Sequence, residues 1–531
     1  MKIRCNLRVW FSSVAVVALC ATSAPSFAQL AHVTVSDGAL SGKTGGEVAA
    51  FLGVPFAAPP TGDDRWKPPR PAAKWEGERQ ADQFAASCQQ AVTPDGFGPW
   101  TREYVVQGRV SEDCLYLNVW TPAKTSGDRL PVLFWIYGGG FTSGSGSVPI
   151  YDGAALAAKG IIVVNVNYRV GVYGFLAHPE LTAESPVHAS GNYGLLDQLA
   201  ALRWVRVNIA AFGGDPTKVT IAGQSAGAAA VHHLIASPLA AGLFARAMAE
   251  SGSGMGLRVP EHAEAEKLGQ QLGNADGKTL SLAALRALST TQLDARVAKM
   301  GGGSGPGSRF GPVVDGLFLP NAQSVGKNEN DTPILTGMTA NETTGLNPAY
   351  GKTTVASFTE QVTATYGATA ADVQALYPAK DDAQAWTSLD ALARDRGLAA
   401  MYFWAQERAR KSRHPIYAYL WTHPEPGPEA DRYGAFHSSE IPYVFATLDT
   451  ARRPFEKADR GLAEQLGGYW VNFVKGGDPN GKRLTTWPKF TDEQKQILEL
   501  GDRTRDRAIL PARQIDVFER YVKSGGALGL F

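Results

Sequence analysis

The chain has 531 residues, of which 44% are hydrophobic, 10% aromatic and 19% charged. This apolar content excludes a disordered chain, and the charged fraction is low for a coiled coil. The 51 lysines and arginines balance 50 aspartates and glutamates, which leaves a formal net charge of +1. Without a basic field to attract phosphates, nucleic acid is not expected as a partner.

The N-terminus has the organisation of a secretory signal peptide. Basic residues lie among the first eight, an apolar stretch covers 14–21, and small residues end at Ala28. We predict cleavage after Ala28, so that 1–28 is a signal peptide and 29–531 forms a single domain. The apolar stretch is too short for a membrane-spanning helix, which needs about 20 residues. The sequence therefore predicts an exported protein, periplasmic or extracellular, with no integral membrane segment in the mature chain.

Two cysteines, Cys88 and Cys114, remain in the predicted mature chain. In an oxidising compartment such a pair favours a disulfide. The bond would close a loop of roughly 25 residues and stabilise the fold by about 3 kcal/mol in the loop-entropy model. Neither cysteine has the nearby His or Cys partners of a zinc site, so we expect no metal here.

Apolar, β-branched runs alternate with helical patterns along the mature chain. This alternation predicts an α/β fold, a mostly parallel sheet with helices on both faces. A glycine-rich stretch over 301–307 is predicted to be a flexible loop or a subdomain boundary. Strands are predicted over 131–137, 161–166, 218–222, 334–335 and 416–420, and a helix over 194–207.

The segment 223–227 reads Gly-Gln-Ser-Ala-Gly and matches the pattern G-x-S-x-G. It follows the strand over 218–222 and precedes a run of small residues over 226–231 that can begin a helix. A nucleophile elbow has this strand–turn–helix context, because the tight turn exposes the serine at the sheet edge and points the helix N-terminus at it. Ser225 is therefore the predicted nucleophile.

Segments spread over most of the mature chain resemble, in the same order, those of the type B carboxylesterases, the α/β-hydrolase family that includes the cholinesterases. The run over 212–227 resembles the family's serine signature, and 112–120 resembles its second signature. The resemblance implies the α/β-hydrolase fold and hydrolysis of small carboxylic esters through an acyl-enzyme, without a cofactor. Shorter similar segments lie at 51–55, 167–169, 191–198 and 312–316.

The resemblance also implies an oxyanion hole. Three glycines over 138–140 follow a predicted strand, where a lipase-type oxyanion loop lies. The implied donors are the backbone amides of Gly139, Gly140 and Ala226. Such donors stabilise the charge that develops on the substrate oxygen, and losing one typically costs about 10² to 10³ in rate.

The serine needs a base, and the fold's chain order places the acid and then the histidine after it. His423 directly follows a predicted strand, and position alone does not separate it from His437. The segment around His437 resembles the family's catalytic-histidine segment, which favours His437 as the base. His232 and His233, on the predicted helix after the elbow, are expected to be packing or surface residues.

Glu342, in the loop after the strand at 334, is the expected acid, and Asp315 is the other candidate, in a motif that resembles a structural turn of the family. Asn341 stands where the family often has Asp. The resemblance further implies three supporting features. These are an ion pair of Arg65 with Glu112, a hydroxyl of Ser251 near the acid–base pair, and the disulfide Cys88–Cys114.

Cholinesterases carry a glutamate directly before the nucleophile, whereas this chain has Gln224. Because choline recognition needs an aromatic face and negative potential, we predict poor activity on choline esters and a preference for uncharged ones. Trp100 is not at the cholinesterase choline-site position. Together with Phe141 and Phe310 it is a candidate for an apolar substrate pocket.

Two other functions are compatible with this fold. A catalytically silent adhesion or binding protein would be expected to lack triad residues, and here all three positions are filled. A hydrolase of amides, thioesters or specialised phenolic esters would keep the triad, because pocket shape selects the leaving group. The natural ester and the oligomeric state are left open by the sequence.

Overall fold

The computed structural model describes Met1 and residues 30–252, 259–275, 277, 279–300, 310–321, 330–347, 351–427 and 429–529. The predicted signal peptide, Met1 apart, lies outside these residues, and so does the glycine-rich stretch over 301–307.

Thirteen strands of the described residues form one sheet, in the order β1-β2-β3-β7-β9-β8-β10-β11-β12-β13-β14-β15, with β4 beside β2. The run from β9 to β14 is parallel, and the strands at both ends of the sheet pair antiparallel. The strand bounds are β1 His32–Val35, β2 Gly38–Gly45, β3 Val48–Pro55, β4 Glu78–Ala81, β7 Tyr116–Thr121, β8 Leu130–Ile136, β9 Ile162–Val166, β10 Gly214–Gln224, β11 Arg246–Glu250, β12 Ile334–Thr339, β13 Ile416–Trp421, β14 Gln496–Leu500 and β15 Arg505–Ala508; β5 Ser87–Cys88 and β6 Val110–Ser111 pair separately.

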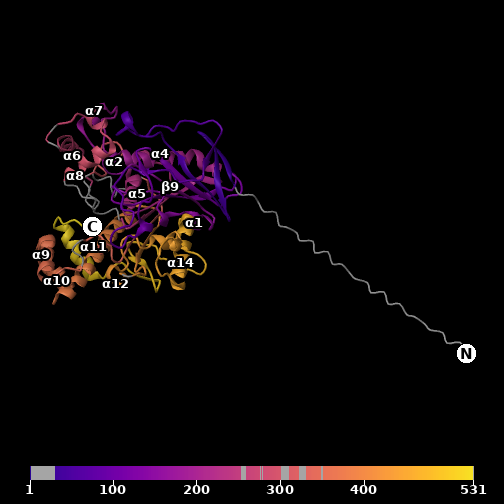
Figure 1. Ribbon diagram of the computed structural model, residues 1–531. Helices are drawn as coiled ribbons and strands as arrows, with labels where there is room; N and C mark the ends of the chain where they lie inside the picture. The colour runs from indigo at the N-terminus through magenta and orange to yellow at the C-terminus, as the bar shows by residue number, and fades with distance from the viewer. Residues whose placement is uncertain are drawn as a thin grey trace.

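Helices cover both faces of this sheet. The chain steps in one direction from β8 to β9 and in the other from β9 to β10, so right-handed crossovers place α1 and α4 on opposite faces. Figure 1 shows α4 on one side of β9, with α1 and α14 on the other. The helix bounds are α1 Ala154–Ala157, α2 Gly171–Phe175, α3 Pro179–Glu184, α4 Tyr193–Asn208, α5 Ala226–Ala236, α6 His262–Asn274, α7 Leu282–Arg286, α8 Thr290–Lys299, α9 Val355–Tyr366, α10 Ala370–Leu376, α11 Asp382–Lys411, α12 Ala430–Tyr433, α13 Ile441–Val444, α14 Lys457–Gly476 and α15 Ala512–Lys523.

The central strands are buried along their whole length. All residues of β9 and all of β13 are buried, which is the pattern of a parallel sheet covered on both faces. The predicted strands and the helix over 194–207 are confirmed, with boundaries shifted by one to a few residues. The α/β prediction is therefore correct.

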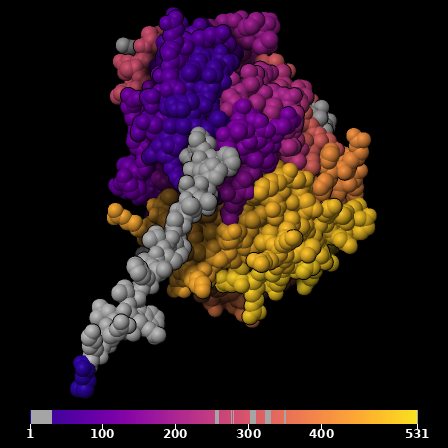
Figure 2. Space-filling view, turned by 90° about the vertical axis from the view of Figure 1, so that its right-hand side faces the viewer, coloured from indigo at the N-terminus to yellow at the C-terminus, as the bar shows by residue number. Residues whose placement is uncertain are grey.

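The two ends of the chain occupy different regions of the surface. In Figure 2 the indigo and violet N-terminal segments form the upper part of the face in view, and the yellow C-terminal segments form the lower part. Cys88, the last residue of β5, forms the predicted disulfide with Cys114. No helix of the described ranges is both long and apolar enough to cross a membrane.

Candidate active site

Ser225 lies at a sharp turn between β10 and α5. Its φ of 59° and ψ of −122° fall in a sparsely populated backbone region that costs free energy and is typical of functional turns. The Ser225 N–H donates to the Glu250 carbonyl at 2.9 Å, and its carbonyl accepts the Ala229 N–H at 2.9 Å. A Cβ on Gly227 would lie 2.0 Å from the Ile136 carbonyl oxygen. The turn therefore requires glycine at 227, and Ser225 is more exposed than its two neighbours.

His437 and Glu342 form a buried pair. The Nδ1 atom of His437 hydrogen-bonds to Oε2 of Glu342, and both residues are 5% exposed or less. The other carboxylate oxygen of Glu342 accepts the Thr339 N–H at 2.8 Å. Because the carboxylate is fixed on both oxygens, it holds the tautomer of His437 that carries its proton on Nδ1.

The second nitrogen of this ring faces the nucleophile turn. The Nε2 atom of His437 lies 3.1 Å from the side-chain nitrogen of Gln224, which directly precedes Ser225. With the proton on Nδ1, Nε2 is an acceptor and takes the Gln224 amide N–H. The acid, the base and the nucleophile turn thus meet at the carboxyl ends of β10 and β12, although these residues lie far apart in the sequence.

Asn341 connects the loop of the acid to the segment before the base. Its Nδ2 donates to Asp390 at 2.7 Å, and its Oδ1 accepts the Ala435 N–H at 2.9 Å. An aspartate here would have no N–H to offer Asp390. The departure from the family pattern therefore has a structural use and leaves the Glu342 carboxylate in place.

The glycine turn after β8 lies against the elbow. A Cβ on Gly138 would be 3.0 Å from Cβ of Ser225. The Gly139 carbonyl accepts the N–H groups of Thr142 and Ser143 at 3.0 and 3.1 Å. In a trans peptide the N–H points opposite to the carbonyl, so the Gly140 amide points out of this turn. Gly139 has a φ of 109°, and a Cβ there would lie 2.3 Å from the Ser143 carbonyl oxygen.

The other histidines are differently placed. His423 follows β13, with Nδ1 2.6 Å from Asp502 and Nε2 2.9 Å from Asp459. His232 and His233 lie buried on α5, and burial lowers their pKa values to about 4 and about 3. The prediction that these two are packing or surface residues is borne out by their burial.

The Arg65–Glu112 ion pair is present and Asp315 lies in a turn, whereas the supporting role of Ser251 stays a prediction. The guanidinium of Arg65 pairs with both oxygens of Glu112 at 2.6 Å, and it also donates to backbone carbonyls of the α7 region. The Asp315 carboxylate accepts the backbone N–H groups of residues 317, 318 and 319 and so closes a turn. Ser251 donates its N–H to Gly337, and its hydroxyl is buried without a hydrogen-bond partner among the described residues.

Two buried glutamates near this site were missed by the sequence reasoning. Glu250 ends β11 and accepts the Trp470 indole N–H at 2.8 Å, while Glu440 accepts the Tyr419 hydroxyl at 3.3 Å. Both are 0% exposed, and Oε2 of each has no hydrogen-bond partner in the described part of the chain. Burial raises the pKa of Glu250 to about 8. Burial, then Glu250 and Glu342, raises the pKa of Glu440 well above its usual range.

The sequence does contain a signal for Glu250 and Glu440. A glutamate closes the otherwise apolar end of the strand at 246–250, and another follows His437 by three residues. Burial raises the pKa of both carboxyl groups and so favours their uncharged forms beside the Glu342–His437 pair.

The predicted substrate-pocket residues are all largely enclosed. Trp100 and Phe310 are 7% and 5% exposed. Phe141, with a φ of 60°, packs its ring edge against Phe175 at 5.3 Å between centroids. Their role in substrate binding stays a prediction.

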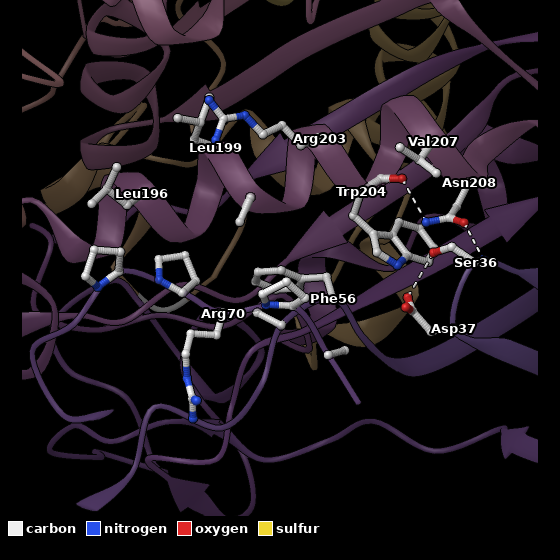
Figure 3. A pocket seen from close by; sticks show the side chains of 16 residues that line it. Ser36, Asp37, Phe56, Arg70, Leu196, Leu199, Arg203, Trp204, Val207 and Asn208 are labelled. Carbon is white, nitrogen blue, oxygen red and sulfur yellow. Dashed lines mark hydrogen bonds between the residues drawn. The ribbon is translucent and has the colours of Figure 1, made fainter. Parts of the chain in front are cut away.

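A separate pocket of about 390 Å³ lies between α4 and the proline-rich segment 68–72. Figure 3 shows Leu196, Leu199 and Trp204 on its α4 wall and Arg70 at the opposite side. None of its lining residues is a predicted site residue, so it is not part of the constellation around Ser225.

The sheet is mostly parallel, a serine lies at a strained strand–helix turn, and a buried carboxylate–histidine pair lies beside it. Together these features define an α/β-hydrolase. The family model described as "Carboxylesterase family" matches residues 29–518. The chain therefore belongs to the carboxylesterase family. It is a carboxylic-ester hydrolase, and the serine acyl-enzyme mechanism is general to that family.

Individual relatives agree with this assignment. The chain is 38% identical over 474 residues to fumonisin B1 esterase of Sphingopyxis macrogoltabida, which covers 86% of this chain and 84% of the relative. It is 34% identical over 488 residues to para-nitrobenzyl esterase of Bacillus subtilis (strain 168), covering 88% and 94%. Carboxylesterase 5A of Canis lupus familiaris is 34% identical over 503 residues, covering 87% and 84%.

Proposed function

We propose that Ser225, His437 and Glu342 form the catalytic triad of this esterase. The observation that carries the proposal is the placement of the His437 ring, with Nδ1 on Glu342 and Nε2 on the residue before Ser225. Nε2 exchanges the Gln224 amide N–H for the Ser225 hydroxyl and takes its proton as the hydroxyl oxygen attacks the ester carbonyl. The Glu342 carboxylate stabilises the imidazolium that results.

The tetrahedral intermediate places negative charge on the former carbonyl oxygen. We propose that the amides of Gly139, Gly140 and Ala226 donate to this oxygen, the last at the N-terminus of α5, where helix amides are unpaired. His437 then gives its proton to the leaving alcohol. Water, activated by the same Nε2, releases the acid from Ser225 and restores the free hydroxyl.

We propose uncharged esters as the preferred substrates, because Gln224 provides no negative charge beside the nucleophile. Aliphatic and aromatic nitrophenyl esters are the natural first panel. The prediction is higher kcat/KM on an uncharged ester than on acetylcholine of similar size. The reverse order would contradict the role assigned to Gln224.

We also propose that 1–28 is removed on export. The disulfide Cys88–Cys114 is typical of an oxidising compartment, and the family match begins at residue 29. The N-terminal sequence of protein recovered from the periplasm or medium is expected to begin at Gln29.

The triad proposal is tested by Ser225→Ala. Loss of the nucleophile is expected to lower kcat by about 10⁶, as in serine proteases where one triad member is removed, with the fold retained by circular dichroism. Gly252→Ser, outside the proposed triad, is the control. Its side chain would crowd the same region, because a Cβ there would lie 2.7 Å from Ala228, but it leaves the Ser225 hydroxyl in place. Substantial hydrolysis by Ser225→Ala would reject the mechanism.

A further inference from the structure

Trp100 lies within the loop that Cys88 and Cys114 close, and it contacts the segment that carries the base. Its indole N–H donates to the His437 backbone carbonyl at 3.0 Å. The indole also packs edge-to-face on the His437 ring, with centroids 6.5 Å apart, and on the Phe436 ring at 6.1 Å. One side chain therefore fixes both the backbone and the ring of His437.

The same indole packs against the loop of the acid. Gly345 follows Glu342 by three residues, and a Cβ added there would lie 2.8 Å from Cη2 of Trp100 and 2.7 Å from Cγ of Pro99. The acid loop thus runs so close to the indole that no side chain fits at 345. Trp100 lies between the loop of Glu342 and the loop of His437 and contacts both.

The loop that carries Trp100 is itself anchored. Arg453 donates to the Pro99 carbonyl at 2.7 Å and to the Thr101 hydroxyl at 3.0 Å, on either side of Trp100. The Tyr104 hydroxyl donates to Glu425 at 2.8 Å. With the disulfide at the ends of the loop, these contacts leave the indole little freedom to move when its neighbours do.

We propose that Trp100 is a positioning residue of the esterase, which sets the distance and ring orientation of the Glu342–His437 pair through contacts with both loops. This inference rests on the proposed triad. It differs from the expectation that Trp100 lines the substrate pocket, because the indole N–H is engaged by the enzyme's own backbone. Misplacing a catalytic group by 1 Å costs about 10²-fold in rate, so a partial loss of support is expected to reduce kcat.

The first test is Trp100→Phe, which removes the indole N–H and the ring atom that faces Gly345. The expected result is a kcat about 10-fold lower with KM within about two-fold of the wild type, measured on a nitrophenyl ester. A substrate-pocket residue would instead raise KM, and that outcome would overturn the proposal. So would a kcat within two-fold of the wild type.

The matched control is Trp75→Phe. The Trp75 indole N–H also donates to a backbone carbonyl, that of Ala39, at 2.8 Å. This variant loses the same kind of hydrogen bond away from the active site, and its kcat is expected to be unchanged. A fall in kcat as large as that of Trp100→Phe would show that any such loss has this effect and would contradict the proposal.

The second test is the double-mutant cycle with Gly345→Ala. Alone, the added methyl group would meet Cγ of Pro99 at 2.7 Å as well as Cη2 of Trp100 at 2.8 Å, and it is expected to lower kcat several-fold. Phenylalanine lacks Cη2, so the same methyl should cost less in the Trp100→Phe background. If the losses in kcat are additive, positions 100 and 345 are not coupled. The proposed contact of Trp100 with the Glu342 loop is then overturned, even if each variant is destabilised.

The proposed triad is tested separately within the same set of proteins. If Ser225→Ala retains activity, the triad fails. If Ser225→Ala is inactive while Trp100→Phe is unaffected, only the positioning role fails.

Discussion

His423 and His437 both follow β13, and both pair with carboxylates. His423 has a carboxylate on each ring nitrogen, Asp502 on Nδ1 and Asp459 on Nε2. His437 has a carboxylate on Nδ1 alone, and its Nε2 faces the turn of Ser225. Carboxylate oxygens lie against both ring nitrogens of His423, so neither nitrogen faces the nucleophile turn.

The comparison shows that a nearby carboxylate does not by itself make a histidine a base. A base needs one nitrogen oriented by an acceptor and the other left facing the nucleophile. His423 instead joins elements, because Asp459 lies near the start of α14 and Asp502 follows β14. Asp459 also accepts the Tyr443 hydroxyl at 2.7 Å.

The largest expected effect separates the two histidines directly. His437→Gln removes the proton acceptor and is expected to lower kcat by about 10⁶. His423→Gln removes a structural bond, so its effect should appear in the melting temperature while kcat stays within a few-fold of the wild type. Steady-state kinetics on one nitrophenyl ester decides between the two histidines. A larger loss of kcat in His423→Gln than in His437→Gln would show that His423, and not His437, is the base.

A smaller effect is expected when the carboxylate partner is neutralised. Glu342→Gln keeps the size of the side chain but permits the wrong tautomer of His437, and a loss of about 10⁴ in kcat is expected by analogy with a serine protease triad. Asp502→Asn makes the same change beside His423 and should leave kcat nearly unchanged. Equal losses in the two variants would remove the distinction between the two sites.

The smallest effect concerns the buried glutamates beneath the site. Burial raises the pKa of Glu250 to about 8 from a usual value of 4.5, so the folded state binds this proton more tightly than the unfolded state. The contribution of Glu250 to the free energy of unfolding of the wild type is therefore fully present below about pH 4.5 and is lost as the pH rises toward 8.

The glutamine side chain of Glu250→Gln cannot ionise. The melting temperature of this variant, relative to that of the wild type, should therefore increase as the pH rises across this window. Calorimetry at several pH values from 5 to 8 measures the difference. Melting curves that stay parallel with pH would contradict a protonated Glu250. The Glu425→Gln variant, at a buried glutamate bonded to Tyr104, provides a comparison away from the elbow.

Much of the scaffold followed from local patterns. Runs of apolar residues rich in β-branched or aromatic side chains predicted β8, β9 and β13, and the Gly-x-Ser-x-Gly segment predicted the elbow. Both signals lie within a few consecutive residues. β10 begins at Gly214, before the predicted 218, since this end of the strand pairs with Leu130 of β8 across a register shift. Pairing of that kind depends on a distant segment.

The details of the site were less accessible for the same reason. Position alone did not separate His423 from His437, because Asp459 and Asp502 come from remote elements; the family resemblance supplied the choice. The bond from Trp100 to His437 joins residues 337 positions apart, and no local pattern encodes it. Glu250 and Glu440 read as ordinary charged residues until the fold buries them.

The most direct test of the account is covalent labelling with a fluorophosphonate followed by peptide mass mapping. One adduct is expected, on Ser225, that forms in step with the loss of esterase activity and does not form in His437→Gln on the same time scale. Complete inactivation with Ser225 unmodified, or an adduct on another serine, would contradict it.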